Sequence, residues 1–157
     1  MKNEILDWIF VFLGEYLIYL IIILFLVYFS KQVWRDKKIE LKEVIIFGSA
    51  SVGAWIITKI IKFFVDAERP FSYFKIETLE THSNIFASFP SGHTTLAFAL
   101  ATSVFVYNKK IGWVMLFLAF LAAIGRPLVG VHFPLDIFVG AIIGTLFPII
   151  ISKFWKR

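Results

Sequence analysis

The sequence predicts an all-α integral membrane protein, a bundle of five transmembrane helices in which residues 1–157 form a single domain. Two observations support this fold class. Hydrophobic residues make up 59% of the chain and charged residues only 17%, whereas a soluble domain carries about a quarter charged residues. In addition, long apolar runs alternate with short basic loops, which is typical of membrane-spanning helices.

Five apolar stretches define the predicted helices, and in chain order they are Ile5–Ser30, Val44–Phe64, Thr94–Tyr107, Ile111–Ile124 and Leu135–Ile151. A helix needs about 20 apolar residues to cross a bilayer, with about 17 as the lower limit. The first two stretches are long enough, and the last three are short unless their polar ends are included. Because lipid offers no hydrogen-bond partner to the backbone, we expect those polar ends to contact protein or a water-filled site.

The first stretch allows two interpretations, because Gly14 and Glu15 interrupt it. In one, residues 4–13 form an amphipathic helix in the membrane interface and Glu15 opens the true span. In the other, the whole stretch is one long tilted helix. The first stretch is not followed by a small-residue cleavage site, so we expect it to be retained rather than removed as a signal peptide.

Basic residues predict the topology. Five spans place ten of them on one side of the membrane, which should be cytoplasmic together with the C-terminus: Lys31, Arg35, Lys37, Lys38, Lys42, Lys109, Lys110, Lys153, Lys156 and Arg157. The N-terminus, the 65–91 loop and the 126–134 turn then share the periplasmic or extracellular side. This distribution explains the net charge of +5 without a nucleic-acid partner. The absence of cysteine leaves neither a disulfide framework nor a thiolate metal site.

Three polar clusters fall at helix ends on the predicted outer side. They read Lys62-x6-Arg69-Pro70, Pro90-Ser91-Gly92-His93 and Arg126-x5-His132-x3-Asp136. Arginine binds phosphate oxygens in bidentate fashion and lysine supplies a point charge, so the three cations suit a phosphate group. Ser91 is a candidate N-cap, and the N–H groups of Gly92 and His93 at that helix start would favour an anion.

Two histidines complete the predicted chemistry. His132 and Asp136 are four residues apart, so they can pair across one helical turn. A carboxylate that accepts the proton of one ring nitrogen leaves the other nitrogen able to attack phosphorus. His132 is therefore the candidate nucleophile, and His93 the candidate acid that protonates the leaving oxygen and later activates water.

The three clusters resemble, in order and spacing, the signature motifs of the type 2 phosphatidic acid phosphatase and haloperoxidase superfamily. The match runs from Lys62 to Asp136, about half the chain. Ten fixed letters against about a million placements give a chance match on the order of 10⁻⁷. The resemblance implies a metal-independent lipid phosphatase with a phosphohistidine intermediate and no cofactor. It implies catalytic roles for His132, His93 and Asp136, and phosphate contacts for a further set, Lys62, Arg69, Ser91, Gly92 and Arg126.

Within the family, the segments 11–16 and 88–95 are similar to small bacterial undecaprenyl pyrophosphate phosphatases. Lipid A 1-phosphatases and phosphatidylglycerophosphate phosphatases share the same motifs and stay as alternatives. This similarity implies a bacterial inner membrane. Two departures from the family stand out: Gly125 replaces the usual serine before the arginine of the third motif, and five spans replace the usual six.

Other charged residues have simpler interpretations. We expect Lys59 to be structural or membrane-facing, Asp66 and Glu68 to be solvated or paired with Lys62 and Arg69, and His82 to be solvated. The three histidines lack the spacing of a metal site.

Two other functions remain: a transporter for an anionic lipid or phosphate, and a vanadium-dependent haloperoxidase.

Overall fold

The computed structural model describes residues 4–35, 39–79 and 85–155, and within these ranges the regular structure is entirely helical. The elements are α1 (Glu4–Val11), the π-helical η1 (Phe12–Tyr16), α2 (Leu17–Ser30), the π-helical η2 (Lys31–Arg35), α3 (Leu41–Val65), α4 (Pro70–Tyr73), α5 (Gly92–Tyr107), α6 (Lys109–Leu128) and α7 (Pro134–Trp155). Among the described residues, four continuous helical stretches have the length and apolar composition of a membrane span. With the shorter α5, they confirm the predicted all-helical fold class.

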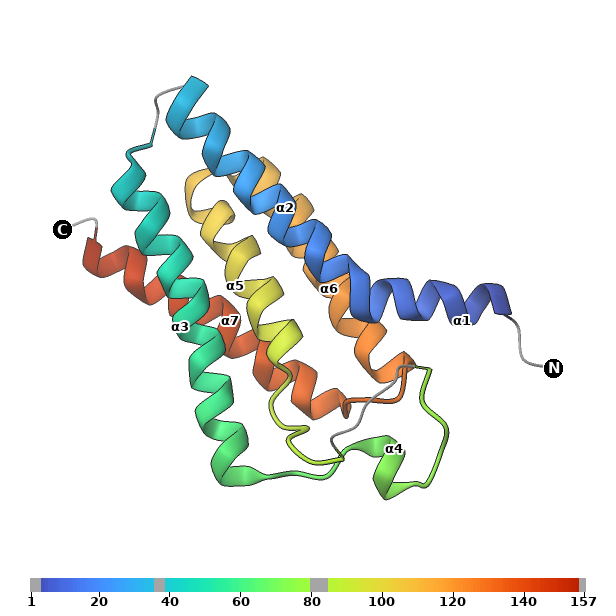
Figure 1. Cartoon of the computed structure of the whole chain (residues 1–157). Coiled ribbons are helices and arrows are strands. Elements are labelled where there is room, and N and C mark those ends of the chain that lie inside the picture. Colours follow the sequence, from blue (N-terminus) through green and yellow to red (C-terminus); the bar gives the residue numbers. More distant parts are fainter. Residues whose placement is uncertain (1–3, 36–38, 80–84, 156–157) are drawn as a thin grey trace.

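The N-terminal stretch is one helical run with a sharp change of direction. Figure 1 shows α1 turned away from the axis of α2, and the π-helical segment η1 joins the two. A π-helical segment adds a residue to a turn and is a recognised cause of helix bending. The bend sets α1 apart from α2, while the helical run itself is continuous from Glu4 to Arg35.

Helix α5 is short because the other helices surround it. Its 16 residues would extend about 24 Å, less than the roughly 30 Å of a hydrocarbon core. Figure 1 shows α5 between α3, α6 and α7, with α2 alongside. Most of its side chains are buried, including polar residues such as Thr102 and Ser103. Because protein rather than lipid covers α5, it does not need the length or the apolar surface of a lipid-facing span.

Glycines allow α7 to pack tightly against α5. Gly140 and Gly144 lie four residues apart on α7, which is the spacing of small residues that lets two membrane helices approach closely. A Cβ at Gly144 would lie 2.3 Å from the carbonyl oxygen of Thr95, and one at Gly140 would lie 2.8 Å from that of Ser91. Side chains at these two positions would therefore separate the helices at the level where α5 begins.

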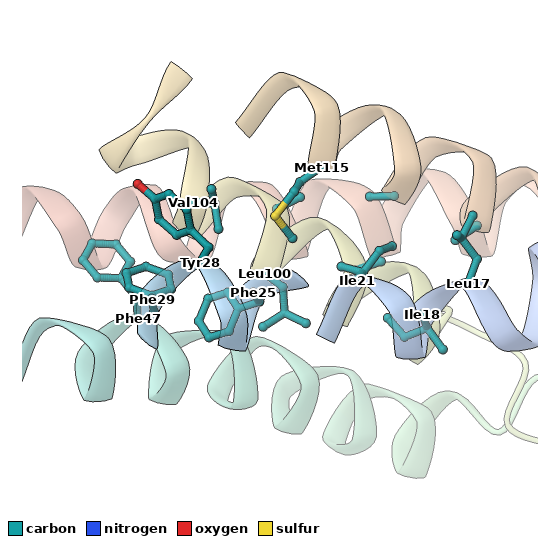
Figure 2. Packing of buried hydrophobic residues seen from close by; sticks show 14 of the residues in the cluster. Leu17, Ile18, Ile21, Phe25, Tyr28, Phe29, Phe47, Leu100, Val104 and Met115 are labelled. Carbon is teal, nitrogen blue, oxygen red and sulfur yellow. The ribbon is translucent and has the colours of Figure 1, made fainter. Parts of the chain in front are cut away.

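Aromatic and aliphatic side chains fill the bundle away from that level. Figure 2 shows Phe25 and Phe29 of α2 facing Phe47 of α3 and Leu100 of α5. The ring of Tyr107 stacks edge-on against both Phe29 and Phe47, with ring centres 5.6 and 5.0 Å apart. This packing fixes the helices relative to one another and so fixes the ends from which the polar clusters project.

Both polar loops lie at the same end of the bundle. In Figure 1 the α3–α5 connection, which contains α4, lies beside the α6–α7 turn. Backbone contacts join them: Leu79 N–H donates to the Val129 carbonyl at 3.3 Å, and Thr78 Oγ1 donates to the same oxygen at 2.9 Å. The α2–α3 and α5–α6 connections lie at the opposite end. The fold therefore brings the three sequence clusters together.

Candidate active site

His132 and Asp136 form a buried pair at the start of α7. The His132 Nδ1 lies 3.1 Å from Asp136 Oδ2, and both residues are only 3% exposed. Asp136 stands in the first turn of α7 and His132 precedes that turn, so one turn separates them as the spacing predicted. With Nδ1 donating to the carboxylate, the Nε2 lone pair of His132 points away from Asp136 and can act as a nucleophile.

Ser88 contributes to this pair, and the sequence analysis assigned it no role. Its hydroxyl donates to Asp136 Oδ2 and lies 3.4 Å from His132 Nδ1. The Phe133 N–H donates to the same carboxylate oxygen at 2.9 Å. Three donors therefore converge on one oxygen of Asp136 and fix its orientation. Ser88 lies in the loop that leads into α5, and this contact crosses 48 positions of the chain, so spacing alone gave no signal for it.

The environment of His132 favours its neutral form. Burial lowers the pKa of the imidazole well below the usual 6.5, and the positive charges of Arg126, Lys62 and Arg69 lower the pKa further. The hydrogen bond with Asp136 acts in the opposite direction and raises it. Burial and the three cations prevail, so His132 is uncharged near neutral pH, as a nucleophile must be.

Lys62 and Arg69 anchor the loop that precedes α5. Lys62 Nζ donates to the carbonyl oxygens of Ala87 and Ser88, and Arg69 donates to those of Phe86 and Val131 at 3.3 and 3.2 Å. Val131 directly precedes His132, so this contact brings the guanidinium near enough for its charge to act on His132. An ammonium has three N–H donors and a guanidinium five, so a cation in these positions can hold the loop and still contact an anion.

The second cluster begins α5 in the way the sequence predicted. Ser91 is the N-cap, and its hydroxyl accepts from Thr94 N–H at 3.4 Å. The Ser91 N–H donates to the Asp136 carbonyl at 3.0 Å, which ties the start of α5 to α7. Gly92 is buried, with Trp55 Nε1 3.3 Å from the position that a Cβ would occupy. His93 follows, and its side chain is 38% exposed, with Nε2 3.9 Å from Glu15 Oε2.

Arg126 is the most deeply buried cation of the site, with 1% of its surface exposed. Its Nη1 donates to Glu15 Oε2 at 2.9 Å and to the Gly14 carbonyl at 3.0 Å. Glu15 Oε2 also lies 3.9 Å from His93 Nε2. Glu15 is therefore a second residue of the site that sequence analysis used only to mark the start of a span. A carboxylate inside an apolar stretch was a signal for such a role.

The same contact explains Gly125, the departure from the family pattern. A Cβ at Gly125 would lie 2.3 Å from the backbone nitrogen of Gly14 and 2.6 Å from its Cα. The backbones of η1 and α6 touch at these two glycines, and this approach brings Glu15 within reach of Arg126. A serine at position 125 does not fit beside the N-terminal segment of this chain.

An apolar cavity of about 230 Å³ lies next to His93. Side chains of α2, α3 and α5 line it, among them Ile18, Ile22, Trp55 and Leu96. The cavity therefore adjoins the group that sequence analysis assigned to protonate the leaving oxygen. It suits a hydrocarbon chain, because its walls are almost wholly apolar.

The remaining charged residues lie apart from this chemistry. The ammonium of Lys59 packs over the ring of Trp55, 4.8 Å from its centre, and Glu68 accepts from the Ser72 hydroxyl. Asp66 ends α3 in the left-handed conformation. His82 lies outside the described residues. Within the described ranges, His, Asp and Glu side chains form no group of three or more that could hold a metal ion.

Comparisons with known proteins show the family of the chain. Residues 43–157 match the PAP2 superfamily. The chain is 34% identical over 144 residues to the bacitracin transport permease protein BcrC of Bacillus licheniformis, covering 92% of this chain and 68% of the relative. It is 35% identical over 151 residues to the undecaprenyl-diphosphatase BcrC of Bacillus subtilis, covering 92% of this chain and 75% of the relative.

A solved structure shares the whole architecture. The crystal structure of LpxE from Aquifex aeolicus superimposes with a TM-score of 0.76 at 30% sequence identity, and the match covers 97% of this chain and 88% of that one. The similarity therefore includes α1, η1 and α2 as well as the region that carries the three motifs.

Proposed function

Because this chain belongs to the PAP2 superfamily and is a lipid phosphatase of the membrane, we propose that its substrate is undecaprenyl diphosphate. The relative that is 35% identical carries the name undecaprenyl-diphosphatase, which supports this choice over other phosphorylated lipids. The observation that supports the chemistry most strongly is the buried pair of His132 and Asp136 beside Arg126. The reaction is removal of the terminal phosphate as inorganic phosphate.

In the first step, His132 Nε2 attacks the terminal phosphorus while the bond from phosphorus to the bridging oxygen breaks. His93 gives its proton to that oxygen, so undecaprenyl phosphate leaves and a phosphohistidine remains. Lys62, Arg69, Arg126 and the N–H groups at the start of α5 stabilise the charge on the phosphoryl oxygens. Asp136 holds the ring of His132 and stabilises the positive charge that the ring gains.

In the second step, His93 takes a proton from a water molecule whose oxygen attacks the phosphohistidine. The bond between phosphorus and nitrogen breaks, inorganic phosphate leaves, and both histidines return to their starting protonation states. Apart from substrate and water, every group that acts in this cycle belongs to the chain. We therefore propose that the reaction needs neither a metal ion nor a cofactor.

The hydrocarbon of the substrate lies, in this proposal, in the cavity beside His93. The leaving group is undecaprenyl phosphate, and His93 protonates its leaving oxygen. The hydrocarbon tail of the substrate must therefore begin close to His93. The walls formed by Ile18, Ile22 and Leu96 offer an apolar surface there. Leu96→Trp should fill the cavity and raise KM for undecaprenyl diphosphate, with little change for a short-chain diphosphate. An equal loss for both substrates would place the hydrocarbon elsewhere.

One preparation of the protein tests the function. We expect phosphate release from undecaprenyl diphosphate with a higher kcat/KM than from phosphatidylglycerophosphate or lipid A, and no inhibition by a chelator. His132→Ala should abolish turnover and also abolish the labelled phosphoenzyme formed from ³²P-substrate. Turnover that persists in His132→Ala would remove the proposed nucleophile. A higher kcat/KM for either other lipid would assign the site to that lipid.

Transport is a second candidate, because one relative is named a bacitracin transport permease. The His132–Asp136 pair lies close to the cations Arg126, Lys62 and Arg69, and this combination, with the PAP2 match, favours hydrolysis over transport. Flux of an anionic lipid that survives in both His132→Ala and His93→Ala would favour transport instead. Bromide oxidation with bound vanadate would indicate the haloperoxidase alternative.

The proposal also places the site on the periplasmic or extracellular face and the C-terminus in the cytoplasm of a bacterial inner membrane. Six of the ten basic residues predicted to be cytoplasmic lie in the described part of the chain, and all six, Lys31, Arg35, Lys42, Lys109, Lys110 and Lys153, lie at the helix ends opposite the site. Positive residues accumulate on the cytoplasmic side of membrane proteins.

A further inference from the structure

A carboxylate from the N-terminal segment occupies the phosphate cradle. Glu15 Oε2 accepts from Arg126 Nη1 at 2.9 Å and lies 3.9 Å from His93 Nε2. It therefore stands between the cation proposed to bind the phosphate and the acid proposed to protonate the leaving oxygen. Glu15 lies outside residues 43–157, the part of the chain that matches the family, so the family motifs assign it no role.

The position of Glu15 is built into the fold. The backbones of Gly14 and Gly125 touch, and Arg126 Nη1 also donates to the Gly14 carbonyl. A buried guanidinium without a partner would be costly, and Arg126 is 1% exposed. Glu15 supplies the opposite charge while its own side chain stays 26% exposed, so it can swing away from Arg126 more easily than Arg126 can move.

A carboxylate and a phosphate group are both anions that accept hydrogen bonds from a guanidinium. We propose that Glu15 is an internal competitor, which occupies Arg126 in the free enzyme and is displaced when a phosphate group enters. This inference rests on the proposed function, because it takes Arg126 as a phosphate contact. When phosphate binds, Arg126 loses its ion pair with Glu15 and gains one with phosphate. The free energy lost with the first pair offsets part of the free energy gained with the second, so phosphate binds less tightly.

The exchange helps the enzyme to turn over. After hydrolysis, inorganic phosphate lies among Lys62, Arg69 and Arg126, and three cations in a largely buried site would hold it tightly. When Glu15 returns to Arg126, it replaces one of these interactions and favours release of the product. Glu15 thus weakens binding of the ground state and of the product alike.

Glu15→Gln tests the inference, because glutamine has the same shape, keeps an acceptor for Arg126 and lacks the charge. Inorganic phosphate should bind the full-length variant in detergent about two- to fivefold more tightly, which corresponds to the loss of a partly exposed ion pair. The constant for product inhibition should fall in parallel. Glu4→Gln is the matched control, since it removes an exposed carboxylate from the same N-terminal segment, and its phosphate affinity should equal that of the parent.

A purely structural role predicts the opposite sign. If Glu15 only holds Arg126 in place, Glu15→Gln should bind phosphate more weakly, and that result, or an unchanged affinity, overturns the inference. Glu15→Asp provides a second variant: it keeps the charge but is one methylene shorter, so its affinity should lie between those of the parent and Glu15→Gln. An affinity for Glu15→Asp at or below that of the parent would also count against the inference.

Thermal unfolding gives an independent readout of the same coupling. Without phosphate, Glu15→Gln should melt at a lower temperature than the parent, because Arg126 loses its counter-charge. Saturating phosphate should raise its melting temperature by more than it raises that of the parent.

A parent chain that neither binds phosphate nor releases it from any lipid would overturn the proposed function. A parent that does both, with an equal or smaller rise for the variant, would overturn only the role of Glu15.

Discussion

At the scale of single residues, Gly125 shows how a departure from a family pattern can be a requirement of this chain. The serine usual at this position would place a Cβ 2.3 Å from the backbone nitrogen of Gly14. Backbone atoms cannot move aside as the end of a flexible side chain can. The close approach of the N-terminal segment therefore requires glycine at position 125, although 111 positions separate Gly14 from Gly125 in the sequence.

We predict that Gly125→Ser, which restores the family residue, will damage this protein. The added side chain should force η1 away from α6 at a cost of about 1–3 kcal/mol in the free energy of unfolding, as for other overpacked sites. Activity should fall as well, because Arg126 follows directly. Thermal unfolding and phosphate release measure the two effects. A Gly125→Ser variant as stable and active as the parent would show that η1 does not press on α6.

The protonation state of His132 gives a second prediction at this scale. Burial and three nearby cations hold its pKa below the usual 6.5, so the imidazole should remain neutral, with the proton on Nδ1, at a pH where an ordinary histidine is half protonated. Nitrogen NMR of histidine-labelled protein can follow this, with His132→Gln to identify the signal. A midpoint at or above 6.5 would contradict the burial argument.

The lowered pKa of His132 also determines how the stability of the folded protein changes with pH. The unfolded chain binds a proton at His132 below pH 6.5, whereas the folded protein resists that proton. The contribution of His132 to folding stability is therefore complete above pH 6.5 and is lost as the pH falls below that value. If His132 is the nucleophile, as proposed, it should stay unprotonated in this range, and its protonation should limit kcat/KM only at a distinctly lower pH.

Residue spacing predicted part of the site, and the reason lies in local geometry. The pairing of His132 with Asp136 and the N-cap role of Ser91 both depend on residues within one helical turn, so spacing predicted them. The contacts of Ser88 with Asp136 and of Glu15 with Arg126 join segments 48 and 111 positions apart. Nothing in local spacing fixes such contacts, because they depend on how α5, α6 and η1 pack.

At the scale of elements, the length of α5 follows from its surroundings. The apolar stretch 94–107 is short for a span, and the structure adds only Gly92 and His93 to it. The sequence could predict that its polar end contacts protein. It could not predict that α5 is central, because its buried polar residues and its small residues give no clear apolar face. The ends of α6 and α7 extend several residues beyond the apolar stretches that predicted them.

Close packing of α5 and α7 gives a prediction for the element scale. Gly144→Ala should place its Cβ against the Thr95 carbonyl oxygen and push the helices apart. Melting temperature should fall, and activity should fall too, because the contact between Ser91 N–H and the Asp136 carbonyl holds the site along the same interface. Gly48→Ala is the matched control, since a Cβ at Gly48 meets no atom within 4 Å.

The control variant should be neutral or slightly more stable than the parent, because alanine favours a helix by up to about 1 kcal/mol relative to glycine. The comparison therefore separates the effect of a clash from the general effect of replacing glycine in a helix. Equal melting temperatures for Gly144→Ala and Gly48→Ala would show that α5 and α7 have room between them.

At the scale of the whole molecule, the fold separates two kinds of charge. One end of the bundle carries the buried cations of the proposed phosphate cradle, and the opposite end carries exposed basic residues on short connections. Lipid-facing side chains between the two ends are apolar, for example Phe117 and Leu146, which are 60% and 51% exposed. This arrangement suits a protein that acts on a headgroup at one surface while its basic end faces the cytoplasm.

Labelling of introduced cysteines tests this orientation, and the native chain has no cysteine to cause background. Tyr73 lies in α4 at the end that holds the site, and Trp34 lies in η2 at the opposite end; both are exposed, at 65% and 77%. Replacing them changes no charge, so the topology signal stays intact.

In intact bacterial spheroplasts a membrane-impermeant maleimide should label Tyr73→Cys, and it should label Trp34→Cys only after the membrane is opened. A permeant maleimide should label both, which controls for reactivity. Labelling in the reverse order would put the site in the cytoplasm, and the positive charges would then lie on the outer side, against the usual rule.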